Sequence, residues 1–133
     1  GIGGESFRLL KSGRYNISLG FDGQSKLKTG SRNISIGDSA LVNNLLSDNI
    51  AIGHQALLGY TGNSFANIGI GTNALTGIGG FGGSVAIGYH AAENIAGGFN
   101  TAIGYGAMGS STGSGDLNVA HWRMTQPEVS IPG

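Results

Sequence analysis

Three histidines are the side chains of this chain best suited to binding a metal ion, namely His54, His90 and His121. A metal site needs ligands that converge within about 2–2.2 Å of one ion. His54 directly follows a glycine that recurs along the chain, whereas His90 comes second after a later copy of that glycine. The spacing therefore predicts no metal site within one chain. It leaves open a site in which a threefold axis gathers three copies of one histidine.

Carboxylates could supply general acids, bases or nucleophiles. The chain has seven of them: Glu5, Asp22, Asp38, Asp48, Glu93, Asp116 and Glu128. No two form the close pair that glycosidases use. Glu5 and Asp22 occupy the same position of successive repeats and are expected to face solvent beside basic residues. We predict that the chain is not an enzyme, although a carboxylate pair formed between chains would make a polysaccharide-cleaving spike.

One glycine-rich segment, Gly77 to Gly82, matches the pattern of a dinucleotide-binding loop. That pattern binds a pyrophosphate only where it joins a strand to a helix and is followed by an acidic partner. Neither accompanies it here, so the sequence predicts no cofactor.

Composition favours a packed, uncharged repeat structure. The chain has 133 residues, of which 27 are glycine and 11% are charged, with a net charge of zero and no cysteine. This balance gives no reason to expect nucleic acid as a partner, and no apolar run is long enough for insertion into a membrane. The opening Gly1 to Gly3 is in register with the repeat, as expected for a piece of a longer protein.

The basic residues are unevenly placed along the chain. Six of them fall in the first quarter: Arg8, Lys11, Arg14, Lys26, Lys28 and Arg32. We interpret them as a solvated basic end of a rod, with a contact surface as the alternative.

A nine-residue phrase recurs along nearly the whole chain. Its clearest copies are Asn33 to Leu41, Asn49 to Leu57 and Asn67 to Leu75. Degenerate copies start at Asn16, Ser84 and Asn100, and the mean spacing is about 17 residues. A fixed period of this size predicts a solenoid of stacked coils.

The phrase alternates large and very small residues, which predicts a strand with one apolar outer face and a reverse face packed on the returning half of its coil. The glycine after each strand predicts a corner with a positive φ angle or a close backbone approach. The alanine–leucine pair that follows suggests a second short strand or turn. The recurring asparagines predict a hydrogen-bonded ladder.

The segments Ser84 to Gly88 and Asn100 to Tyr105 resemble the head repeats of trimeric autotransporter adhesins and related repeats of bacteriophage tail fibres. The resemblance implies an all-β fold, a left-handed parallel β-roll of about seven coils, assembled as a homotrimer. The period near 17 and the frequent alanine–leucine pair favour the phage-fibre version. We expect the array to span residues 1–108, with a glycine/serine link and a C-terminal cap or junction over 109–133.

The large outward residues also predict the trimer on physical grounds, because a thin coil cannot bury them and an exposed apolar stripe promotes aggregation. The predicted trimer core consists of Ile34, Ile36, Ile50, Ile52, Ile68, Ile70, Val85, Ile87 and Ile103.

These expectations lead to a structural and adhesive function: a segment of a virion tail fibre, or of an extracellular bacterial surface protein, that mediates attachment to a cell-surface glycan or protein receptor. Aromatic and histidine side chains are the candidate ligand-binding residues: Tyr89, Tyr105, His54, Tyr60, Phe81 and Trp122. The same side chains could instead cover the edges of neighbouring coils. The alternatives are the head of a trimeric bacterial adhesin and a passive shaft, including that of a polysaccharide-degrading tailspike.

Overall fold

The computed structural model describes residues 1–43, 47–59, 65–77, 82–109 and 119–121. Within them the chain forms seven three-residue strands. These are β1 (Ile17–Leu19), β2 (Ile34–Ile36), β3 (Ile50–Ile52), β4 (Ile68–Ile70), β5 (Val85–Ile87), β6 (Thr101–Ile103) and β7 (Val119–His121).

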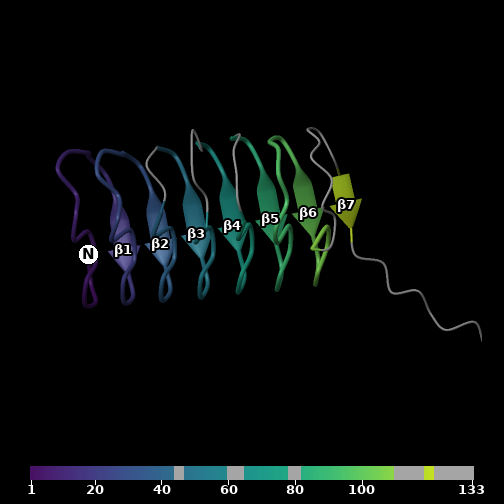
Figure 1. Cartoon of the computed structure of the whole chain (residues 1–133), viewed down its shortest axis with the longest axis horizontal. Helices are drawn as coiled ribbons and strands as arrows, with labels where there is room; N and C mark the ends of the chain where they lie inside the picture. The colour runs from purple at the N-terminus through teal and green to yellow at the C-terminus, as the bar shows by residue number, and fades with distance from the viewer. Residues whose placement is uncertain (44–46, 60–64, 78–81, 110–118, 122–133) are drawn as a thin grey trace, which may run out of the picture.

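The strands form one parallel sheet in chain order, β1 to β7. Equivalent repeat positions pair throughout, for example Ile34 with Ile50 and Ile36 with Ile52. Figure 1 shows the coils side by side, with a narrow turn after each strand from β1 to β6. The predicted all-β solenoid with a period near 17 is confirmed, and about five complete turns are formed rather than seven. The sheet continues past Met108, because β7 pairs with β6 in register.

The middle residue of each strand from β1 to β6 is buried, as the alternation predicts. Gly69 shows what lies behind it: a Cβ atom added there would be 3.1 Å from the Ala74 carbonyl oxygen and 3.3 Å from Leu57 Cγ. The reverse face therefore packs on the alanine and leucine columns of the returning half-coils. This confirms that small side chains are required because the coil is thin.

The alanine–leucine segments form turns and not second strands. Leu41, Leu57 and Leu75 are fully buried, yet their φ angles are 59°, 55° and 54°. Left-handed backbone is incompatible with an extended strand. We call the segment from this position to the following loop the return limb. In the coil between β1 and β2, Gln24 stands at the leucine position and the return limb covers residues 24–28.

The corner glycines adopt the backbone that the sequence predicts. Gly37, Gly53, Gly71 and Gly88 have φ angles of 131°, 133°, 126° and 136°. A side chain in this region is strained, and each glycine also lies against the backbone of the next coil.

The asparagine ladder is also confirmed. The Oδ1 atom of Asn33 accepts hydrogen bonds from Asn49 N at 3.0 Å and Asn49 Nδ2 at 3.1 Å. Asn49 Oδ1 accepts the equivalent pair from Asn67, both at 3.1 Å. These asparagines are fully buried, so each amide satisfies polar groups that could not reach water.

Candidate binding surface

The outward face of the sheet carries an apolar stripe, which we call the isoleucine stripe. It consists of the large residues on either side of each buried central position. Ile17 is 55% exposed and Ile36 is 37% exposed, while Ile50, Ile52, Ile68 and Ile70 are partly buried. Neighbouring side chains in the stripe cover one another only in part, because the sheet presents them to the outside.

A second column of outward residues follows the corner glycines. Two of its members, Tyr89 and Tyr105, are brought together by the pairing of β5 with β6. Their ring centroids lie 5.2 Å apart with 14° between the ring planes, a stacked arrangement. The residues are 47% and 63% exposed. This Tyr89–Tyr105 pair is an aromatic platform open to solvent.

A polar network adjoins the platform. His90 Nδ1 is hydrogen-bonded to Glu93 Oε2, and Asn73 Nδ2 lies 3.3 Å from His90 Nε2. The His90 ring thus bridges the Glu93 carboxylate and the Asn73 amide through its two nitrogens. The Tyr89 and His90 rings lie 4.1 Å apart. Asn73 and Glu93 were not anticipated as site residues, although Asn73 is one period before His90.

The remaining predicted ligand-binding residues are not brought to this platform. His54 is exposed and in the same column as Tyr89, but Thr72 of the intervening coil separates them. Tyr60, Phe81 and Trp122 lie outside the described residues, as do most of the glycine/serine link and the predicted cap.

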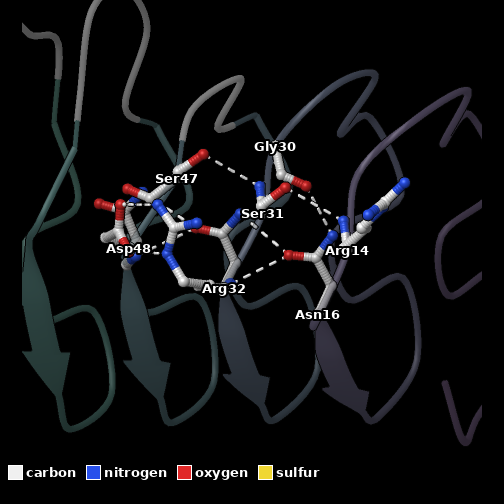
Figure 2. Close-up of polar contacts among 9 residues, drawn as sticks. Arg14, Asn16, Gly30, Ser31, Arg32, Ser47 and Asp48 are labelled. Atoms are coloured by element: carbon white, nitrogen blue, oxygen red, sulfur yellow. Dashed lines mark hydrogen bonds and ion pairs between the residues drawn. The ribbon is translucent and has the colours of Figure 1, made fainter.

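The residues that lead into the strands of the first coils form polar contacts with one another, as Figure 2 shows. Arg32 Nε lies 2.5 Å from Asp48 Oδ1, and Arg32 Nη2 donates to Asp48 Oδ2 at 2.8 Å. The hydrogen bond from Arg32 lowers the pKa of Asp48 below its usual value and raises the pKa of Arg32. Nearby, Ser31 Oγ accepts from Arg14 N at 3.0 Å, and Asn16 Nδ2 donates to Gly30 O at 2.7 Å.

The described residues contain no cluster of three potential metal ligands and no helix long and apolar enough to cross a bilayer. Comparisons with protein-family models, curated proteins and solved structures find no match to this chain. The isoleucine stripe and the aromatic platform are the two surface features that bear on function.

Proposed function

We propose that this chain is a structural and adhesive segment of a homotrimeric fibre that attaches to a cell surface, with the tail fibre of a phage as the favoured setting. In this proposal three left-handed β-rolls pack about a common axis, and the segment performs no catalysis. The isoleucine stripe is the observation that carries the proposal.

The stripe supports assembly because it is apolar from β1 to β5 and remains partly exposed, with Ile36 at 37% and Ile87 at 38%. Burying an aliphatic side chain fully is worth about 1.5–3 kcal/mol, and each predicted core residue is 40% exposed or less, so covering the exposed part contributes at most about 1 kcal/mol per residue. Nine such residues in the predicted core would add at most about 9 kcal/mol per chain before the entropy of association is subtracted. Closed symmetry lets every chain cover its stripe without leaving an open end.

The Tyr89–Tyr105 pair supports the adhesive part of the proposal. Its rings are exposed, rigid and next to the hydrogen-bonding groups of Asn73, His90 and Glu93. An aromatic face with polar neighbours suits the apolar face and hydroxyl groups of a sugar. The alternatives are the head of a bacterial trimeric adhesin, and a shaft, including that of a tailspike, that only spaces a binding tip.

The assembly proposal is tested by placing a charge on the stripe. Ile52→Asp should convert a trimer into monomers in sedimentation equilibrium, because three carboxylates would be buried without partners. His54→Asp is the matched control: it adds the same side chain to the same coil at an exposed position. A wild-type chain that sediments as a folded monomer would disprove the trimer.

A further inference from the structure

The first two coils carry several exposed cations, and three lysines among them share one outer surface. Lys11, Arg14, Lys26 and Lys28 are all exposed. Lys11 N donates to Lys28 O at 2.9 Å, and the next residue, Ser12, forms a parallel bridge with Thr29. Lys11 and Lys28 therefore leave the backbone side by side on successive coils, about 4.8 Å apart.

This surface faces away from the isoleucine stripe. In the return limb, Leu27 is fully buried between Lys26 and Lys28, which are exposed. The buried side chains of the return limbs pack behind the sheet, as Leu57 does beside Gly69. The lysines consequently project from the opposite side of the coil and remain accessible if other copies cover the stripe.

No carboxylate of the described residues neutralises the charge of these four cations. Of the six basic residues in the first quarter, Arg8 is paired with Glu5 and Arg32 with Asp48. Among the described residues, no ion pair involves Lys11, Arg14, Lys26 or Lys28. Like charges on adjacent positions of neighbouring strands repel, so an anion placed over them would relieve that repulsion.

We propose that Lys11, Lys26 and Lys28 form an anion-binding face that docks an acidic polysaccharide. Lys11 and Lys28 follow one another along the solenoid axis, which matches a linear polymer with repeated anionic groups better than a single small ion. Three cations are fewer than the roughly six to ten phosphate contacts of a protein whose DNA binding is strongly salt-dependent. The choice of a polysaccharide rests on the proposed attachment to cell surfaces, whereas the anionic character of the ligand rests on these charges alone.

The experiment compares two double variants that remove the same net charge. Lys11→Gln/Lys28→Gln removes unpaired cations, and Arg8→Gln/Arg32→Gln removes cations that already have carboxylate partners. Binding of the full chain to heparin, a sulfated polysaccharide probe, is measured by calorimetry in low and high salt, with dextran as the uncharged probe. Circular dichroism verifies that both variants are folded.

We expect the lysine variant to bind heparin about thirtyfold more weakly than the wild type, because each removed cation should lower the affinity about fivefold. The arginine variant should stay within about threefold, and wild-type binding should fall steeply as added salt screens the charges. The proposal would be overturned if the two variants lost affinity equally, if the lysine variant were unaffected, or if the wild type did not bind heparin. Wild-type binding to dextran as tight as to heparin, or tighter binding to duplex DNA or anionic vesicles, would overturn it as well.

The outcome is separable from that of the proposed function. A monomeric chain that binds heparin through these lysines would disprove the trimer and support the anion-binding face. A trimer that fails to bind heparin would disprove only the anion-binding face.

Discussion

Gly71 lies directly against Gly88 of the next coil: a Cβ atom on Gly71 would be 2.4 Å from the Gly88 carbonyl oxygen. Its φ angle of 126° is also one that side chains rarely adopt. The two constraints add, because a shift of the next coil would relieve the contact and still leave a side chain at a strained backbone angle.

Gly71→Val should therefore lower the free energy of unfolding by about 3 kcal/mol or more, through backbone strain and steric overlap. Gly106→Ala is the control, because Gly106 has a φ of 62° and a Cβ atom added there would have no atom within 4 Å. It should cost only about 1 kcal/mol. Urea denaturation at a fixed chain concentration measures both, and equal costs would contradict the contact with Gly88.

The asparagine ladder gives a graded prediction. Asn49→Ala removes a buried acceptor of two hydrogen bonds and should cost about 2–4 kcal/mol. Asn49→Ser should cost less, because Ser84 already serves in this column and its Oγ accepts from Asn100 N at 3.2 Å. Thermal melts of the two variants test the order, and a serine variant no more stable than the alanine variant would argue against the ladder.

The thin interior predicts a strong asymmetry between the two sides of a strand. Ala51→Leu adds volume to a fully buried position and should destabilise the coil by about 1–3 kcal/mol or more. Thr101→Leu adds an apolar side chain on the outward side of the same sheet, where Thr101 is only partly buried, and should be tolerated. Similar melting temperatures for both variants would show that the interior has spare room.

The Arg32–Asp48 pair predicts a small dependence of stability on pH. The pKa of Asp48 is lower in the folded chain, so its contribution is present above the unfolded pKa of about 4 and is lost as the pH falls through the folded value. The stability difference between wild type and Asp48→Asn should therefore shrink below about pH 4 and in high salt. Urea denaturation over a pH series measures it, and a difference that grows on acidification would have the wrong sign.

The aromatic platform is tested by cell attachment. Tyr89→Ala combined with Tyr105→Ala should leave the fold intact, because both rings are exposed, and should reduce attachment about tenfold or more if stacking carries the contact. Phe21→Ala is the control, as an exposed aromatic of the same column in a distant coil. Unchanged attachment by the tyrosine variant would favour the spacer alternative.

The regular parts of this fold could be read from the residues alone. The alternation around Ala51 fixes which face is buried, and the invariant glycine marks a corner where no Cβ atom fits. The asparagine column predicts its own ladder. Each of these signals is a short-range steric or hydrogen-bonding requirement, repeated every turn, so the sequence carries it without knowledge of the rest of the chain.

The irregular parts were decided by contacts between coils. Ser39 and Leu41 have left-handed backbone that their residue types do not favour. Their N–H groups donate to Phe21 O and Ala56 O, each at 2.9 Å, and these bonds to the neighbouring coils hold them there. The same stacking places Asn73 beside His90 and Lys11 beside Lys28, which one coil cannot specify because each contact needs residues from two. The sequence by itself thus determined the coil, and the tertiary structure determined which side chains meet on its surface.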